Sequence, residues 1–383
     1  MKVILSIEPV RFPLTGIGRY TYELARHLQA SDTVEELHLL GASRFVDHLP
    51  ASAAPRPAIS SALRQRLLAS DLLVDLYRGV ASVRKWQLLK RHGDGIYHGP
   101  NFYLPPFPGA SVVTIHDLSV YRWEHCHPPE RVRYMRKEMA LTLKRADMLI
   151  ADSEFVRQEI IAFFGWPADK VRAVPLASTG TFRPHSREEL QPTMTSLQLQ
   201  ADGYCLFSGT IEPRKNLDTL LDAYGALPQA LRRRWPLVLC GYRGWESEAL
   251  HARIEQAQRE GWVRYLGYVP EEQLAALFAG ARLFVFPSLY EGFGLPLLEA
   301  LASGVPVVCS NAASLPEVSG GVAAACDPLD TERLKALIER GLEDEAWRER
   351  AKAQGLRRAA EFSWQDCARQ TVAVYRELAN VAA

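Results

Sequence analysis

The sequence contains 383 residues, of which 48% are hydrophobic and 23% are charged, and its formal net charge is +1. These values are typical of globular proteins and exclude a largely disordered chain or a long coiled coil. The near-neutral charge gives no reason to expect nucleic acid as a partner. A chain of this length is too long for one ordinary core and predicts two domains of roughly 150–200 residues each.

The six cysteines form no Cys-x-x-Cys pair, and several lie in or beside apolar runs. This usage indicates small buried residues in a reducing compartment rather than a disulfide or zinc framework. The apolar run at the N-terminus breaks at Glu8 and Pro9, which makes it too short for a signal peptide or a membrane span. We therefore expect a cytoplasmic protein.

In the first half of the chain, short apolar runs alternate with helical patterns, which is typical of parallel α/β units. This half, residues 1–180, is predicted to form a Rossmann-like domain. The predicted strands are Val3–Ile7, Glu36–Leu40, Ile96–His98, Val112–Ile115, Met148–Ala151 and Val171–Val174, and the predicted helices are Gly18–Gln29, Glu130–Lys144 and Glu154–Phe164, the last after the N-cap signal Asp152-Ser153.

The segment 181–200 has weak periodicity and scattered proline, serine and threonine, so we interpret it as a linker. Residues 201–362 repeat the α/β pattern and predict a second Rossmann-like domain. Two facing parallel sheets place a ligand cleft between the carboxyl ends of their strands. The predicted strands are Tyr204–Ser208, Leu237–Cys240, Val263–Leu266, Leu283–Phe286, Val305–Cys309 and Val322–Cys326, with helices starting near Asn216, Glu246, Glu271, Pro296 and Thr331.

The segment from Glu291 to Glu299, Glu-Gly-Phe-Gly-Leu-Pro-Leu-Leu-Glu, follows a predicted strand and enters a predicted helix. Gly292 and Gly294 let the backbone approach a ligand closely, and Pro296 suits a first helical turn. The helix N-terminus favours phosphate or sugar hydroxyls. One glutamate is predicted to bind sugar hydroxyls and the other a ribose diol, although a capped helix with two incidental glutamates gives the same spacing.

Adjacent basic residues Arg214 and Lys215 follow the first predicted strand of the second domain. At the mouth of a cleft, this pair can neutralise a pyrophosphate leaving group without a metal, whereas elsewhere it is a solvated turn. The sequence has no Asp-x-Asp motif that would clamp a divalent ion on the pyrophosphate. We therefore expect no metal cofactor.

Two features of the first domain face the same predicted cleft. Gly16 and Gly18 enter the first helix but lack the third glycine of the dinucleotide fingerprint, which argues against nicotinamide binding. We interpret them as backbone that faces the phosphates. His116 ends a predicted buried strand, where side chains enter the cleft, so we expect it to face the sugar. The nearby His125, Cys126 and His127 lack a recognised metal-ligand spacing.

The stretch Arg64–Arg91 mixes basic residues with leucine, valine and tryptophan. This composition suits a helix that contacts anionic lipid headgroups at the inner face of the cytoplasmic membrane. A helix packed on its own domain with a solvated basic face has the same composition. Both interpretations remain open at the level of sequence.

Together these motifs resemble family 4 of the retaining glycosyltransferases, which have the GT-B fold of two facing Rossmann-like domains. The resemblance covers essentially the whole chain. It also implies that residues 363–383 form a helix that crosses back to the N-terminal, acceptor-binding domain. The motifs that carry it are the Gly16/Gly18 segment, His116-Asp117, Ala151-Asp152-Ser153, Gly209 to Asn216, Leu266 to Pro270, the Glu291–Glu299 segment and Ser314 to Glu317.

The resemblance implies a role for each residue of the donor site. Glu299 binds the donor ribose and Glu291 contacts the transferred sugar, while the backbone of Phe293, Gly294 and Leu295 holds sugar hydroxyls and phosphate. The basic pair binds the diphosphate.

On the same basis, the backbone near Tyr268 and Val269 contacts the base, and His116 lies beside the reacting sugar. The anomeric configuration is retained. No covalent nucleophile is evident, so we favour front-face displacement, in which positioning and charge stabilisation supply the rate enhancement.

The stretch from His116 to Glu130 is most similar to bacterial mannosyl- and rhamnosyltransferases of surface-polysaccharide assembly. This similarity favours a GDP-linked donor such as GDP-mannose, as a co-substrate rather than a cofactor, and a lipid-linked oligosaccharide acceptor in O-antigen-like synthesis. Two alternatives are a nucleotide-sugar 2-epimerase of the same fold and a non-catalytic partner subunit. The non-catalytic alternative predicts loss of Glu291, His116 or the Arg214-Lys215 pair, and all are present.

Overall fold

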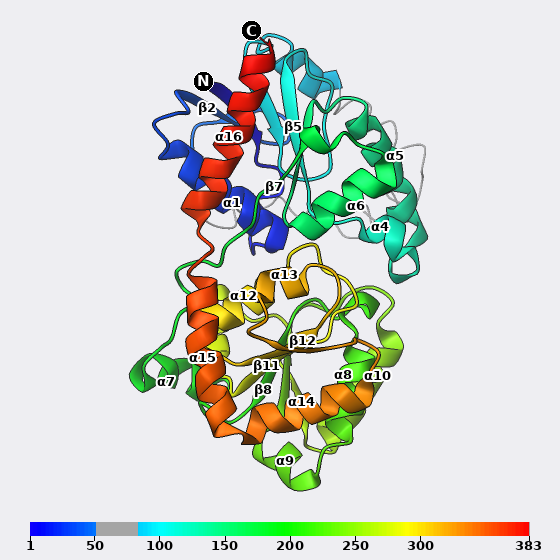
Figure 1. Cartoon of the computed structure of the whole chain (residues 1–383), viewed down its shortest axis with the longest axis vertical. Coiled ribbons are helices and arrows are strands. Elements are labelled where there is room, and N and C mark those ends of the chain that lie inside the picture. The colour runs from blue at the N-terminus through cyan, green and yellow to red at the C-terminus, as the bar shows by residue number, and fades with distance from the viewer. Residues whose placement is uncertain (51–82, 383) are drawn as a thin grey trace, which may run out of the picture.

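The computed structural model describes residues 1–50 and 83–382, which form two α/β domains stacked along the long axis of the molecule (Figure 1). The described part of the first domain contains a sheet with the order β3-β2-β1-β4-β5-β6-β7, in which only the β2–β3 pair is antiparallel. Its strands are β1 (Lys2–Ser6), β2 (Glu36–Leu40), β3 (Phe45–Val46), β4 (Ile96–Gly99), β5 (Ala110–Ile115), β6 (Met148–Ala151) and β7 (Val171–Ala173).

The first helix of the first domain begins at the cleft. Helix α1 (Gly16–Gln29) starts two residues before the predicted boundary, because the Thr15 side chain accepts from the Gly18 backbone N–H and caps it. Gly16 and Gly18 therefore lie in the first helical turn. This domain also contains α4 (Ser119–Arg122), α5 (Pro129–Leu143) and α6 (Glu154–Phe164), with short 3-10 turns at Glu124–Cys126 and Ala168–Lys170, and residues 83–89 are helical.

The second domain contains a parallel sheet with the order β10-β9-β8-β11-β12-β13. Both sheets reverse their order beside the first strand of the domain, which is where open α/β sheets form their ligand crevice. The strands are β8 (Cys205–Ser208), β9 (Leu237–Cys240), β10 (Val263–Tyr265), β11 (Leu283–Phe286), β12 (Val307–Ser310) and β13 (Ala324–Cys326).

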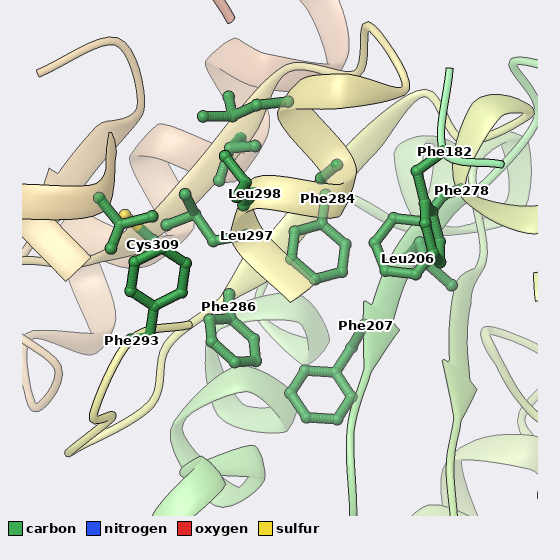
Figure 2. Close-up of a cluster of buried hydrophobic side chains, with 14 of the residues drawn as sticks. Phe182, Leu206, Phe207, Phe278, Phe284, Phe286, Phe293, Leu297, Leu298 and Cys309 are labelled. Atoms are coloured by element: carbon green, nitrogen blue, oxygen red, sulfur yellow. The ribbon is translucent and has the colours of Figure 1, made fainter. Parts of the chain in front are cut away.

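Helices surround this sheet, and a 3-10 turn at Pro213–Lys215 follows β8. The packed centre is rich in aromatic rings, including Phe207, Phe284 and Phe286, which are fully buried (Figure 2). Burying such apolar surface is the main stabilising term of the domain. The helices are α8 (Leu217–Gly225), α9 (Gln229–Arg234), α10 (Glu248–Arg259), α11 (Glu271–Ala279), α12 (Leu295–Ala302), α13 (Leu315–Ser319), α14 (Thr331–Glu343) and α15 (Glu345–Ala359).

The segment predicted to be a linker, residues 181–200, contains a helix, α7 (Arg187–Ser196). A capping box between Ser186 and Glu189 starts it, and Pro192 lies inside it, which weakened its helical pattern in the sequence. The segment is also anchored to the second domain, since Phe182 is buried edge-on against Phe278 with ring centroids 5.4 Å apart. It is therefore structured rather than an unstructured connection.

The last helix, α16 (Trp364–Ala382), follows α15 on the second domain and packs on α1 and on β4, β5 and β6 of the first domain (Figure 1). Trp364 and Tyr375 are both buried there.

The basic stretch Arg64–Arg91 lies largely outside the described residues. In its described end, Val83 and Trp86 are exposed, whereas Lys85 is buried. Among residues 1–50 and 83–382, no helix is long and apolar enough to cross a membrane.

Candidate active site

The two domains are in close contact at Gly292, between β11 and α12. A Cβ atom at this position would lie 1.8 Å from the backbone oxygen of His116, so only glycine fits. The Gly292 carbonyl accepts a hydrogen bond of 2.7 Å from the Ser153 hydroxyl of the first domain. Gly294 follows with φ at 99°, a conformation that favours glycine, and serves as the N-cap of α12. The structure therefore places the predicted glycine segment against the first domain.

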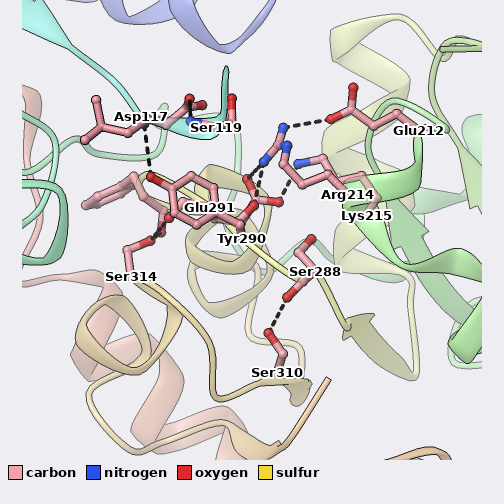
Figure 3. A network of polar contacts seen from close by, with 12 residues as sticks. Asp117, Ser119, Glu212, Arg214, Lys215, Ser288, Tyr290, Glu291, Ser310 and Ser314 are labelled. Atoms are coloured by element: carbon pink, nitrogen blue, oxygen red, sulfur yellow. Dashed lines mark hydrogen bonds and ion pairs between the residues drawn. The ribbon is translucent and has the colours of Figure 1, made fainter. Parts of the chain in front are cut away.

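Glu291 lies at the centre of a buried charge cluster (Figure 3). Its Oε1 is 2.5 Å from the Lys215 Nζ, and its Oε2 is 3.2 Å from Arg214 Nη1. Arg214 also donates to the Tyr290 carbonyl oxygen at 2.6 Å and to Glu212 at 2.7 Å. The structure thus brings together the three residues that the sequence assigned to sugar and diphosphate.

The charge states of this cluster follow from its contacts. Burial alone would raise the pKa of Glu291, but the Lys215 and Arg214 cations hold that pKa below its ordinary value. Burial would lower the pKa of Arg214, yet the carboxylates of Glu291, Glu212 and Asp117 raise it. Glu291 is therefore a carboxylate at neutral pH, and the basic pair is already partnered by protein carboxylates, which the sequence did not predict.

His116 lies across the cleft at the end of β5, with both ring nitrogens engaged. Its Nδ1 is 2.7 Å from the Asp152 carboxylate, and its Nε2 is 2.8 Å from the Pro100 carbonyl oxygen. A carbonyl and an ionised carboxylate both accept, so with Asp152 ionised His116 has two N–H donors and is an imidazolium ring. Burial would lower the pKa of His116, but Asp152 raises it above its ordinary value.

A neutral hydrogen-bond network lies beside His116 in the first-domain core. His98 is 2.7 Å from the Tyr375 hydroxyl and 2.9 Å from the Thr114 hydroxyl, which is 2.8 Å from the Tyr20 hydroxyl. Burial lowers the pKa of His98 to about 3, so its ring is uncharged at neutral pH. The Tyr20 ring packs edge-on against the His116 ring, with centroids 5.1 Å apart.

Glu299 is buried within the second turn of α12. Burial raises its pKa to about 7, with Glu271 adding to the rise and Arg19 opposing it. Arg19 extends from α1 across the cleft and forms an ion pair with Glu271 at the start of α11. Neither Arg19 nor Glu271 was predicted, because their pairing joins residues that are far apart in the sequence.

Tyr268 and Val269, which the sequence assigned to the base, follow β10. Val269 is buried and Tyr268 is 43% exposed. The Tyr268 ring stacks on Tyr242, which is 45% exposed, with centroids 4.7 Å apart and planes 16° apart. Sequence analysis missed Tyr242, although it lies two residues after the predicted strand Leu237–Cys240, at the edge where ligand-binding side chains gather.

Several contacts between the domains were also absent from the sequence prediction. The Tyr290 hydroxyl donates to Glu159 at 2.5 Å and accepts from the Leu118 backbone N–H at 3.0 Å. The Glu317 carboxylate accepts from the backbone N–H groups of Glu154 and Phe155 at 2.9 and 3.0 Å. It therefore caps α6 from the other domain.

One local interpretation of the sequence was incomplete. The N-cap of α6 is Ser153, whose hydroxyl accepts from the Val156 N–H at 3.2 Å, whereas Asp152 turns to His116. His127, which was considered above as a metal ligand, has other contacts. Its ring stacks on Trp245 with centroids 5.6 Å apart, and its Nε2 contacts the Ser119 hydroxyl. In the part of the chain that the structure describes, no group of three His, Cys, Asp or Glu residues is arranged to hold a metal ion.

Two facing Rossmann-like domains, with a glycine-led helix and buried charges in the cleft, define a glycosyltransferase of the GT-B class. Residues 14–177 match the model of the Glycosyltransferase Family 4 domain, and residues 196–358 match that of Glycosyl transferases group 1. The chain is 46% identical to O-antigen chain mannosyltransferase B of Escherichia coli, over 99% of this chain and 100% of the relative. The chain belongs to this family of glycosyltransferases.

Solved structures share the fold. A glycosyltransferase of lipopolysaccharide biosynthesis, WaaG, aligns with a TM-score of 0.70 and 15% identity, over 96% of this chain and 98% of that one. Anabaena HepE in complex with UDP-glucose aligns with a TM-score of 0.68 and 17% identity, over 100% of this chain and 99% of that one. The predicted GT-B architecture is confirmed.

Proposed function

We propose that this enzyme transfers mannose from GDP-mannose to a lipid-linked oligosaccharide, with retention of configuration, during assembly of an O-antigen-like polysaccharide at the cytoplasmic face of the membrane. The full-length identity to an O-antigen mannosyltransferase supports mannose and this type of acceptor. The single structural observation behind the proposal is the Glu291 carboxylate, held between Arg214 and Lys215 beside the N-terminus of α12.

The donor would lie along α12. Glu299 would accept the hydroxyls of the ribose, and the free backbone N–H groups at Phe293, Gly294 and Leu295 would face phosphate and sugar oxygens. The base would lie against the stacked rings of Tyr268 and Tyr242 and the backbone at Val269. The first turn of α1 completes this site, since a Cβ at Gly16 would lie 3.9 Å from Leu295 Cδ1.

The reaction would proceed on one face of the sugar. The acceptor hydroxyl oxygen forms a bond to the anomeric carbon as the bond from that carbon to the β-phosphate oxygen breaks. The hydroxyl proton passes to the departing GDP, so the charges balance without a covalent enzyme intermediate.

Arg214 and Lys215 would stabilise the negative charge that develops on the diphosphate, and this electrostatic effect is the largest contribution we assign to the protein. In the structure, Glu291 satisfies both cations, so a bound diphosphate would share them with it. This arrangement holds the Glu291 carboxylate in one orientation for sugar hydroxyls. It also supplies two positive charges from the protein, and we propose that transfer needs no metal.

His116 would act as a fixed cation beside the sugar. Because its N–H groups are directed to Asp152 and the Pro100 carbonyl, we assign it to charge stabilisation and positioning rather than to proton transfer. This interpretation refines the sugar-facing role expected from the sequence.

Membrane contact through Arg64–Arg91 is part of the proposal, because a lipid-linked acceptor requires the enzyme to work near a bilayer. In the described end of this segment, exposed Trp86 and Val83 lie among the basic residues Arg84, Lys90 and Arg91. This mixture of apolar and basic side chains suits an anionic interface.

A thermal-shift screen with GDP, UDP, ADP and dTDP tests the nucleotide, because a ligand that binds the folded state raises its melting temperature. We expect a selective shift with GDP. Incubation with GDP-mannose and an octyl α-mannoside, followed by mass spectrometry and NMR, should then reveal an added mannose with an α-anomeric proton. A β-linked product would contradict retention. Because we propose that no metal is needed, enzyme treated with a chelator should show full transfer.

A further inference from the structure

Arg19 is a buried arginine of the first domain that reaches the donor side of the cleft. It lies near the start of α1 and is only 8% exposed. Its guanidinium forms an interdomain ion pair with the Glu271 carboxylate at the start of α11, and its Nη1 lies 3.5 Å from the Thr179 hydroxyl. The centroid of the Phe182 ring is 5.9 Å from Arg19 Cζ. The side chain is therefore fixed at the junction of the two domains.

Arg19 and Glu299 lie on the helix faces where the two domains meet. A Cβ atom at Gly16 would lie 3.9 Å from Leu295 Cδ1, so the start of α1 contacts the start of α12 (Figure 1). Arg19 follows Gly16 by three residues, and Glu299 follows Leu295 by four. Residues at these spacings share one face of a helix. This geometry places Arg19 toward the side of α12 that carries Glu299, the glutamate assigned to the donor ribose.

Electrostatic interactions link Arg19 with both glutamates. Burial would lower the pKa of Arg19, but the carboxylates of Glu299 and Glu271 raise it, and Glu299 has the larger effect. Burial raises the pKa of Glu299 to about 7, while Arg19 opposes this rise and Glu271 adds to it. The charge of the ribose glutamate thus depends on one cation from the first domain and one anion from the second.

Other titratable groups on the elements around Glu299 are uncharged or have partners of their own. Burial raises the pKa of the Cys240 thiol, which interacts with Glu299, to about 12, so this thiol is uncharged at neutral pH. Helices α13 and α15 also pack on α12. On these helices, Glu317 accepts from the N-terminus of α6, and Arg358 pairs with Glu361. The interdomain ion pair therefore has the main influence on the charge of Glu299.

We propose that Arg19 is a positioning residue for the donor that acts through Glu299, by keeping this carboxylate ionised where α1 meets α12. An ionised carboxylate can accept from both ribose hydroxyls, whereas its protonated form must donate one hydrogen bond. Because Arg19 belongs to the first domain, the ribose glutamate of the second domain has its full capacity to accept only when the domains are in contact. The inference rests on the proposed function, in which Glu299 binds the ribose, and it gives the first domain a part in nucleoside binding.

The test compares Arg19→Gln and Glu271→Gln, which break the same ion pair from opposite sides. Isothermal titration calorimetry measures GDP affinity between pH 6 and 9, and the ratio to the wild type at each pH cancels the titration of GDP itself. Loss of the cation should raise the pKa of Glu299, so Arg19→Gln should bind GDP about three- to tenfold more weakly at pH 7 and nearly as tightly as the wild type at pH 9. Loss of the anion should lower that pKa, so Glu271→Gln should bind GDP about threefold more tightly at pH 6.

Two further variants supply the controls. Arg26→Gln removes an exposed positive charge from the same helix and should follow the wild type at each pH. In a Glu299→Gln background, the addition of Arg19→Gln should change GDP affinity by the same factor at every pH, because the ionisable ribose ligand is gone. Melting temperatures show whether each variant is folded.

The outcomes separate this inference from the proposed function. If Arg19 only ties the domains together, both variants of the ion pair should weaken GDP binding equally at all pH values, which would overturn the inference and leave the proposed function standing. A loss in Arg19→Gln that still depends on pH in the Glu299→Gln background would also overturn the inference, because another group would be its source. Absence of both GDP binding and transfer in the wild type would overturn the proposed function and this inference with it.

Discussion

The two sides of the cleft are built from different kinds of polar interaction. On the second domain, Arg214, Lys215, Glu212 and Glu291 form a buried cluster of full charges. On the first domain, a buried network of uncharged groups lies behind the cleft, as in the hydrogen bond between His98 and Thr114. The first domain also places full charges at the cleft, in the ion pair of His116 with Asp152 and in Arg19, which pairs with Glu271.

This difference matches the two substrates. A nucleotide diphosphate carries charge, so its side of the cleft needs preorganised charges of the opposite sign, held in place by counter-charges. A neutral oligosaccharide needs shape and hydrogen bonds, and a rigid uncharged core can supply these. The comparison therefore predicts that charge-removing substitutions will have much larger effects on the second domain than on the first.

The largest effect is expected for Glu291→Gln, which keeps the size of the side chain and removes its charge. We expect kcat to fall about a thousandfold, because the carboxylate that binds the sugar and orients both cations is lost. Glu291→Ala is a poorer variant, since it leaves two buried cations without this partner and would also destabilise the fold.

The matched control is Glu212→Gln, which removes a different carboxylate from Arg214. Its melting temperature should fall by a similar amount, but kcat should fall far less. Equal losses of kcat in both variants would mean that Glu291 acts only through the stability of the cluster.

The second prediction concerns Glu299→Gln and nucleotide binding. Loss of the carboxylate should weaken GDP binding about ten- to a hundredfold, because charge-assisted hydrogen bonds with the ribose are replaced by neutral ones. In the wild type, affinity should decline as the pH falls below about 7, where the buried Glu299 becomes protonated. Isothermal titration calorimetry at pH 6 and 8 measures both effects, and an equal pH dependence in the variant would exclude Glu299 as its source.

The raised pKa of Glu299 also predicts how the stability of the fold depends on pH. Ionisation of Glu299 should favour GDP binding but should destabilise the folded protein. The pKa of Glu299 in the folded protein, about 7, lies above its ordinary value. The contribution of Glu299 to the free energy of unfolding is therefore fully present below the ordinary pKa and is lost as the pH rises through 7. Glu299→Gln should melt at a higher temperature than the wild type at pH 8, and this difference should shrink at pH 5.

The third prediction tests the ion pair of His116 and Asp152 on the first domain. Asp152→Asn should lower the pKa of His116, so the imidazolium would lose its proton at a lower pH than in the wild type. We expect kcat to fall on the order of tenfold at pH 8 and less at pH 6. A pH profile of kcat parallel to that of the wild type would show that Asp152 only supports the structure.

Local sequence was sufficient to predict much of the second-domain side of the cleft. Glu291, Gly294 and Glu299 lie in one short segment, where a strand, a left-handed glycine and a helix follow one another. Local signals can also be outweighed, as in α7, where Pro192 obscured a helix that the Ser186 capping box starts. The two sheets were predictable for the same reason, since their strands are continuous apolar runs.

The remaining features depend on contacts between distant parts of the chain. Asp152 was interpreted through its neighbour Ser153, and its pairing with His116 required the register between β5 and β6. The ion pair of Arg19 with Glu271 spans the two domains. Spacing in one sequence carries no signal for such pairs, whereas the topology of the sheets brings them together.

The smallest effect is expected for a substitution of Glu317, at the contact between the two domains. Glu317→Gln would weaken the cap that the second domain places on α6, because a neutral amide interacts less favourably with the helix N-terminus. The contact is exposed, so the free energy of domain closure should change by less than about 1 kcal/mol. We expect the KM for GDP-mannose to rise a few-fold with little change in kcat, because closure contributes to donor binding whereas the reacting groups stay unchanged.

The matched variant Glu154→Gln on the same helix keeps the Glu317 cap and should leave the KM unaltered. If Glu317→Gln instead lowered kcat as strongly as Asp152→Asn, domain closure would control the chemical step, and the contrast between the two sides of the cleft would be secondary to their alignment.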